Sequence, residues 1–127
     1  MDRRPRQIKM FVTRILESHP GELNNIVNEY MNYLSFEPNG FNFTPLTLED
    51  SINGICQELF SSRPATSPYV LSAMVLAKTV DQYLLENNVG HPWYNRDILV
   101  DIMTRILVRT EFDPNGYRSS FSWCTIL

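Results

Sequence analysis

The chain has 127 residues and a mass of 14.8 kDa, which predicts a single domain over residues 1–127 with no second core. Its 43% hydrophobic and 20% charged residues are typical of a globular protein and exclude a disordered chain. A net charge of −3 argues against a nucleic-acid partner, which needs a dense field of Lys and Arg. The one basic cluster is interpreted as a solvated leader, and residues 1–5 and 118–127 are expected to be flexible. That cluster comprises Arg3, Arg4, Arg6 and Lys9.

Cysteine and histidine are too sparse to indicate a metal site or a disulfide framework. Cys56 and Cys124 stand alone, and with His19 and His91 they form no zinc spacing, so we expect a reducing compartment and neither metal nor cofactor. Arginine and proline interrupt the first residues, so no signal peptide is expected. The longest uncharged run, between residues 63 and 78, contains two prolines and is too short to span a bilayer.

The first half of the chain predicts three amphipathic helices. A stripe at helical spacing runs through residues 8–16 and ends before Pro20 and Gly21, and a second runs through residues 23–34. Residues 37–45 are predicted to form a loop rich in aromatic side chains. Thr47 is predicted to cap a third helix over residues 48–60, with Asp50 positioned for a capping box.

The second half predicts a hydrophobic helical hairpin. Ser67 and Pro68 suit the start of a helix that reaches about Glu86 and is apolar around most of its first half, so it should be buried on all sides. Asn95 is predicted to cap a further helix through residue 108, whose apolar residues again exceed one stripe. A turn is expected at residues 113–116. No strand is predicted, so the expected class is all-α.

No set of residues indicates catalysis. His19 and His91 each precede a proline and do not orient a nucleophile, while Glu49 and Asp50 suit the first turn of a helix. A phosphate-binding glycine loop and a metal-binding helix are both missing from the sequence. We therefore predict a protein without enzymatic activity, whose function lies in its apolar surfaces.

The order of three short motifs resembles that of the Bcl-2 family. Residues 47–60 end in Glu58-Leu59-Phe60, as the fourth helix of that family ends, and a buried helix follows after a short loop. Residues 23–30 are similar to the third homology motif, and residues 111–117 lie where the second homology motif places its turn. The resemblance covers residues 6–121 and implies a Bcl-2-like helical bundle around a central hydrophobic hairpin.

Three departures from the family pattern bear on function. Residues 66–69 replace the motif that carries the family's groove arginine, so ligand recognition must be altered. Val27 and Asn28 stand where the third motif has a small residue and an aspartate, which makes this chain a poor death ligand. The long first loop and the membrane helix are missing, which is typical of viral members, and a large DNA virus such as a fish iridovirus is the expected source.

The resemblance implies a groove that binds an amphipathic helix, the Bcl-2 homology 3 motif, of a host proapoptotic protein: Bim first, then Bak or Bax. Such an inhibitor would act in the host cytoplasm, at or near mitochondria. Arg63 is a candidate replacement for the missing arginine, and Tyr69 lies near the place of that arginine. The remaining candidate groove residues are Tyr30, Met31, Leu34, Phe36, Phe41, Ile52, Ile55, Cys56, Leu59, Val70, Leu71 and Met74.

Two other functions stay open at this stage. One is a Bcl-2-like inhibitor of innate immune signalling that acts through a surface or a homodimer interface, and the other is an unrelated helical adaptor. The last four residues, from Cys124, fit a prenylation pattern loosely because Thr125 is not aliphatic. A tail that packs or frays is the preferred interpretation of this segment.

Overall fold

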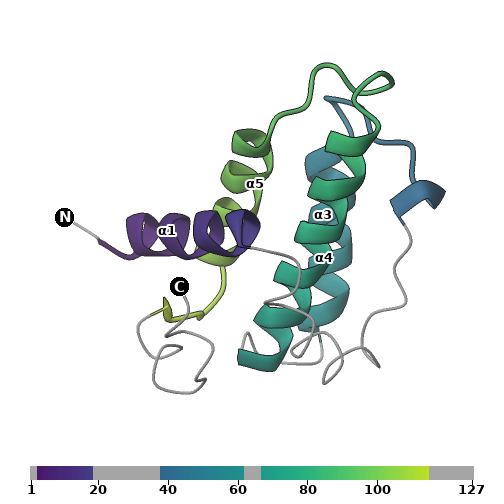
Figure 1. The fold of residues 1–127 in the computed structure, drawn as a ribbon. Helices are drawn as coiled ribbons and strands as arrows, with labels where there is room; N and C mark the ends of the chain where they lie inside the picture. The colour runs from purple at the N-terminus through teal and green to yellow at the C-terminus, as the bar shows by residue number, and fades with distance from the viewer. Residues whose placement is uncertain (1–2, 19–37, 62–66, 115–127) are drawn as a thin grey trace.

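The protein is all-helical over the residues that the structure describes, which in this computed structural model are 3–18, 38–61 and 67–114 (Figure 1). Four α-helices and one short 3₁₀ helix account for the regular structure, and these ranges contain no strand. The predicted all-α class is confirmed. The elements are α1 (Arg4–Glu17), η2 (Pro38–Gly40), α3 (Leu48–Ser61), α4 (Ser67–Glu86) and α5 (Arg96–Val108).

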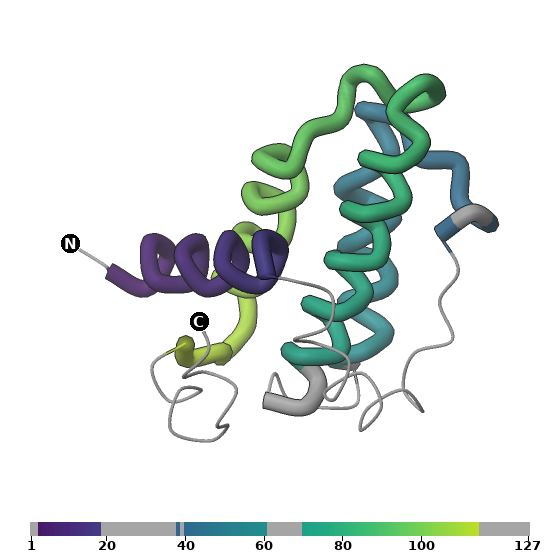
Figure 2. Tube along the Cα trace, viewed as in Figure 1, coloured from purple at the N-terminus to yellow at the C-terminus, as the bar shows by residue number. Residues whose placement is uncertain are grey.

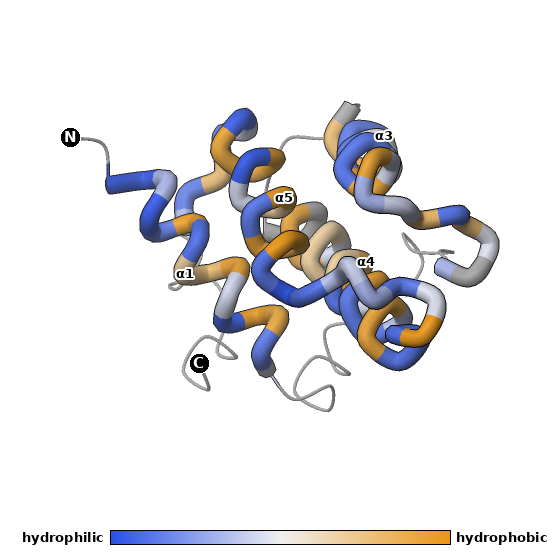
Figure 3. The backbone as a smooth tube through the Cα atoms, turned by 90° about the horizontal axis from the view of Figure 1, so that it is seen from above, coloured by the Kyte–Doolittle hydropathy of each residue, from blue (hydrophilic) through white to orange (hydrophobic). Residues whose placement is uncertain are grey.

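The helices pack around α4. The chain runs along α3 and returns along α4 beside it, and then turns through residues 87–95 into α5 (Figures 1 and 2). The α1 helix contacts both α5 and α4, and α3 packs against the same two helices. Viewed along a perpendicular direction, α1 lies on one outer side of the bundle and α3 on the other (Figure 3).

The α4 helix is buried around nearly its whole circumference, as the sequence predicts. Residues 70–74 are consecutive buried positions, and residues 76–78 form a second buried run. Consecutive residues point about 100° apart on a helix, so such a run requires neighbours on every side. Three of the buried side chains are polar, namely Ser72, Lys78 and Asp81.

The α5 helix has one broad buried face and a charged outer face. Asn95 caps it as predicted, because its side-chain oxygen accepts a hydrogen bond from the Ile98 N–H at 3.3 Å. Asp97, Asp101 and Arg105, four residues apart, are exposed. The second helix of the hairpin is therefore not enclosed as α4 is. Its buried residues are Leu99, Val100, Ile102, Met103, Ile106 and Leu107.

The N-terminal region differs from the expected flexible leader. The α1 helix already begins at Arg4, whose guanidinium donates to the carbonyl oxygens of Val108 at 2.8 Å and Phe112 at 3.0 Å. It also donates to the Leu107 and Thr110 carbonyls. The last carbonyls of a helix have no partner within it, and a cation there also complements the helix dipole. Arg4 is thus a structural link between the two ends of the described chain.

A buried lysine holds the other end of α1. The Lys78 ammonium, on α4, donates to the Leu16 carbonyl and, at 2.6 Å, to the Ser18 carbonyl. Ser18 itself ends the helix, with its hydroxyl donating to the Ile15 carbonyl at 2.6 Å. The α1 helix is therefore fixed at its first residue to α5 and after its last residue to α4.

An ion pair between Glu49 and Arg105 joins α3 to α5, with a second contact from the Arg105 Nε to the carboxylate at 3.3 Å. The hydrogen bond from Arg105 lowers the pKa of Glu49 below its ordinary value of 4.5. Because the folded pKa lies below the unfolded one, the pair stabilises the fold at neutral pH and this contribution disappears as pH falls through the folded pKa.

Replacing Arg105 by glutamine should therefore lower the free energy of unfolding slightly at pH 7 and not at all in acid. Both side chains are more than a third exposed, at 48% and 40%, so the effect at pH 7 should not exceed about 1 kcal/mol. Urea titrations of both proteins between neutral and strongly acidic pH measure the difference. A difference that is independent of pH would show that Arg105 acts through packing alone.

Candidate functional site

The candidate groove lies along α3 and the first half of α4. Its position depends on the rotation of α3 about its axis, which decides which residues face the core. Leu48, Ile52 and Leu59 form the buried face of α3. Glu49 marks the edge of α3 that faces α5, because its carboxylate pairs with Arg105. By helical periodicity Ser51 and Glu58 lie on the opposite edge. Ile55, which is partly buried against the core, lies where that edge meets the buried face.

Most of the described groove candidates belong to the core. Six of them are at most 7% exposed, and Ile55 is intermediate. A fully buried side chain cannot contact a ligand until its neighbours move aside, so these residues line no open surface in this conformation. The six buried candidates are Ile52, Cys56, Leu59, Val70, Leu71 and Met74.

Phe41 lies outside that core, with 39% of its surface exposed. Its ring stacks on Phe43 with centroids 5.6 Å apart, and Phe43 in turn contacts Tyr83 on α4. The predicted aromatic loop therefore covers the C-terminal half of α4. The same row of rings continues from Tyr83 through His91 and Trp93 to Tyr94.

Several predicted site residues fall outside the described residues. These are Tyr30, Met31, Leu34, Phe36 and Arg63, as well as the prenylation candidate Cys124. Tyr69 belongs to the first turn of α4, but its side chain is not among those described. The structure therefore brings together α3 and α4, which form one side of the predicted groove. The other predicted side, residues 23–36, is not tested.

The predicted capping box between Thr47 and Asp50 is not among the contacts of the described residues, since the Thr47 side chain bonds to the turn before the helix. Thr47 precedes α3, and its hydroxyl accepts from the Thr44 N–H at 2.9 Å and donates to the Asn42 carbonyl at 3.2 Å. This side chain orders the turn that leads into the helix. The α4 helix begins at Ser67, one residue before the predicted first position at Pro68.

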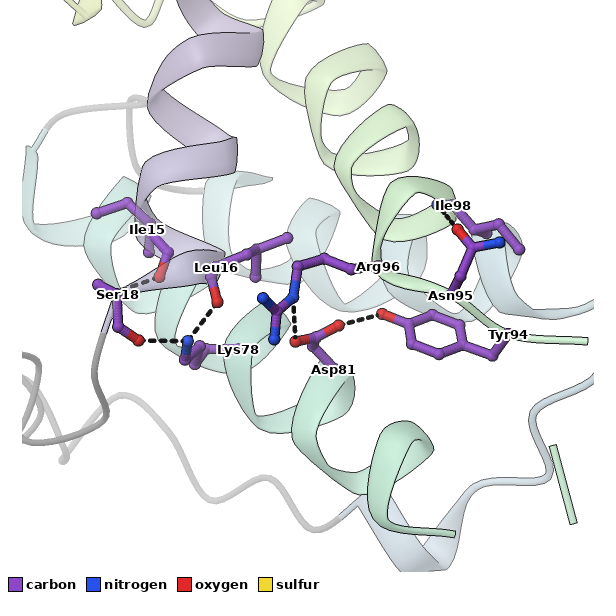
Figure 4. A network of polar contacts seen from close by, with 9 residues as sticks. All are labelled: Ile15, Leu16, Ser18, Lys78, Asp81, Tyr94, Asn95, Arg96 and Ile98. Atoms are coloured by element: carbon purple, nitrogen blue, oxygen red, sulfur yellow. Dashed lines mark hydrogen bonds and ion pairs between the residues drawn. The ribbon is translucent and has the colours of Figure 1, made fainter. Parts of the chain in front are cut away.

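Sequence reasoning missed a polar cluster between α4 and the segment before α5 (Figure 4). The Asp81 carboxylate is fully buried, accepts from the Tyr94 hydroxyl at 2.5 Å, and pairs with the Arg96 Nε at 3.0 Å. Burial, with the hydrogen bond to Asp81, raises the pKa of Tyr94, so the phenol stays protonated and donates. Asp81 and Lys78 are the two charged positions between residues 70 and 84 of a helix that must be buried, and that was the available signal, because buried charges are almost always paired.

Cys56 is a free thiol in the core. Burial raises the pKa of the Cys56 thiol to about 12, so it stays protonated and unreactive at neutral pH. Among the described side chains, no group of three or more His, Cys, Asp or Glu could hold a metal ion. Within the same part of the chain, every helix is too short or too polar to cross a bilayer.

Comparison with known proteins identifies no relative. Neither the family models nor the curated proteins nor the solved structures contain a match to this chain.

Proposed function

We propose that this chain adopts the Bcl-2 helical bundle and sequesters the amphipathic Bcl-2 homology 3 helix of a host proapoptotic protein, Bim before Bak or Bax. The order of elements supports this proposal. The α3 helix carries Glu58-Leu59-Phe60 in its last turn and precedes α4, which is enclosed by its neighbours and contacts α5. Such an inhibitor would act in the cytoplasm of an infected cell, at the mitochondrial surface, and would block apoptosis.

The observation that carries the proposal is the position of Ile55. It is an apolar side chain on the edge of α3 away from α5, next to the buried Leu59, and only part of it is covered by the core. In the resemblance these two residues match the groove floor. Each apolar anchor of a ligand helix buried there would contribute about 1.5–3 kcal/mol before ordering costs.

Burial of the deeper candidates implies that the groove must open before it is fully occupied. Met74 and Leu71 become accessible to a ligand only when side chains above them move. The apparent dissociation constant then equals the intrinsic one divided by the fraction of molecules whose groove is open. The opening step also slows association.

Calorimetry against a panel of proapoptotic helices tests the proposal. We expect at least one peptide to bind with a dissociation constant from nanomolar to micromolar, which is about −12 to −8 kcal/mol. Scrambled peptides of equal composition, which keep the charge and lose the amphipathic order, serve as controls. If no peptide of the panel gives heat or raises the thermal midpoint, the groove proposal fails.

The ligand's aspartate should matter little to this protein. Within residues 48–61 and 67–77, the described walls of the groove contain no Lys or Arg, and Lys78 is turned toward the end of α1. Replacing the peptide's aspartate with alanine should lose about 1 kcal/mol, against about 2–5 kcal/mol when a buried charge pair is broken. A loss in the higher range would mean that Arg63 or another cation outside these walls binds the aspartate.

A second candidate function is favoured by the burial of six groove candidates. A closed face would suit a Bcl-2-like inhibitor of innate immune signalling that acts through another surface or as a homodimer. Failure of every death-ligand peptide, together with a dimeric mass in light scattering, would favour this second function over the first.

A further inference from the structure

The outer side of α1 carries a stripe of positive charge. Ile8, Val12 and Ile15 face the core and are fully buried. Arg6, Met10 and Arg14 follow at intervals of four, which places them together on the opposite side of the helix over a length of about 12 Å. We name Arg3, Arg6, Met10 and Arg14 the α1 stripe.

The α1 stripe is accessible to a partner. Arg3 and Arg6 are exposed, Arg14 is partly exposed, and Met10 has 49% of its surface exposed. The α1 helix lies at the outer side of the bundle (Figure 3). Lys9 flanks the stripe and pairs loosely with Asp101, at 3.7 Å between two side chains that are both more than half exposed.

The charge on α1 is opposite to that of the whole chain. This helix holds four of the chain's 11 cations and one of its 14 carboxylates, Glu17, which is exposed on the side of the stripe and ends it three residues after Arg14. Arg4 donates to carbonyls at the end of α5 and just after it, whereas Arg3 and Arg6 are exposed. Their charge is unfavourable to the helix, because its first turn has no acidic residue and cations near an N-terminus oppose the dipole.

We propose that the α1 stripe docks this protein on an anionic lipid bilayer. Guanidinium groups suit lipid phosphates, and a partly exposed thioether between them suits the boundary between headgroups and acyl chains. The apolar face of α1 stays in the core, so the binding is peripheral and reversible.

This docking surface is separate from the candidate groove. The stripe lies on α1, whereas the groove candidates lie on α3 and α4, and Figure 3 shows α1 and α3 on different sides of the bundle. Carboxylates elsewhere on the surface repel an anionic bilayer only weakly, because charges are screened beyond about 8 Å at physiological salt. The proposal therefore stands whether or not a death-ligand helix binds.

Co-sedimentation of the full chain with vesicles tests the proposal. Vesicles of phosphatidylcholine with about one third phosphatidylserine should bind the protein at physiological salt, and neutral phosphatidylcholine vesicles should not. Each arginine near an anionic surface contributes about a fivefold change in partition, so Arg6→Gln should weaken binding about fivefold and the double variant R6Q/R14Q about 25-fold. Salt near 1 M, with a Debye length of about 3 Å, should release the protein.

Arg105→Gln is the matched control, because it removes the same charge from an exposed side chain that pairs with Glu49 of α3, on the other side of the bundle from α1 (Figure 3). It should leave the partition unchanged, whereas Met10→Ser should lower it severalfold. Circular dichroism confirms that each variant is folded. Equal losses in R6Q and R105Q, equal binding to neutral vesicles, or binding to polyglutamate with none to vesicles would each overturn the bilayer proposal, the last in favour of an acidic protein.

Discussion

Replacing Ile55 by lysine should abolish binding of a death-ligand helix and leave the protein folded. Ile55 is only partly buried and lies at the edge of the α3 core face, so a lysine there can extend its ammonium into water. In the complex the same ammonium would be enclosed by the apolar anchors of the ligand, where a charge without a partner is strongly unfavourable. We expect the affinity to fall by a factor of about 100 or more, which corresponds to about 3 kcal/mol.

Two variants on the same helix control this experiment. Gln57→Lys adds the same charge at an exposed position on another side of α3 and should bind the peptide like the unchanged protein. Leu59→Lys places the charge where only 7% of the side chain is exposed and should unfold the domain. Calorimetry measures binding, and circular dichroism measures helix content.

Undiminished binding by folded I55K would exclude the groove from this edge of α3. If I55K itself unfolds, the milder Ile55→Ala decides the question, because it removes the apolar contact without adding charge. A folded alanine variant that binds as tightly as the unchanged protein would contradict the proposal in the same way.

Helix positions were predictable because apolar periodicity is a local property of the sequence. The stripe of residues 8–16, the enclosed helix from Ser67 and the cap at Asn95 all correspond to observed elements. Arg4 was not predictable in this way. Its partners lie at the end of α5 and just after it, more than 100 positions along the chain, and no local pattern indicates such a contact.

The candidate site was less predictable than the fold. Periodicity identifies which residues of α3 and α4 are apolar, but the same apolar residues can line a groove or fill a core, and only packing distinguishes the two. In the structure Ile52, Cys56 and Met74 are core residues, while Ile55 keeps part of its surface. The difference depends on the rotation of α3 about its own axis, which decides which of its residues face the core. The ion pair between Glu49 and Arg105 shows this rotation in the structure, and no sequence motif indicates it.

Within the polar cluster of Asp81, Tyr94 and Arg96, the largest loss of stability should come from replacing Arg96. The Asp81 carboxylate has no exposed surface and two partners, Tyr94 and Arg96. Replacing Arg96 with methionine leaves it with the Tyr94 hydroxyl alone. Removing one member of a buried ion pair typically costs about 3–5 kcal/mol, and we expect the lower end because the Arg96 side chain is 36% exposed and water can partly replace it. For a domain stable by about 5–15 kcal/mol this is a large fraction.

Asp81→Asn should cost less than Arg96→Met, although it changes the more deeply buried residue. The asparagine side chain keeps an oxygen that can accept from Tyr94, and no buried charge is left without its cation, while Arg96 can turn toward solvent. Urea unfolding followed by circular dichroism measures both variants, with the exposed Arg109→Met expected to change stability by less than about 0.5 kcal/mol. If D81N destabilised the protein more than R96M, the proposal that Arg96 is the main partner of the buried carboxylate would be wrong. Contacts of Asp81 other than the one with Arg96 would then contribute most to stability.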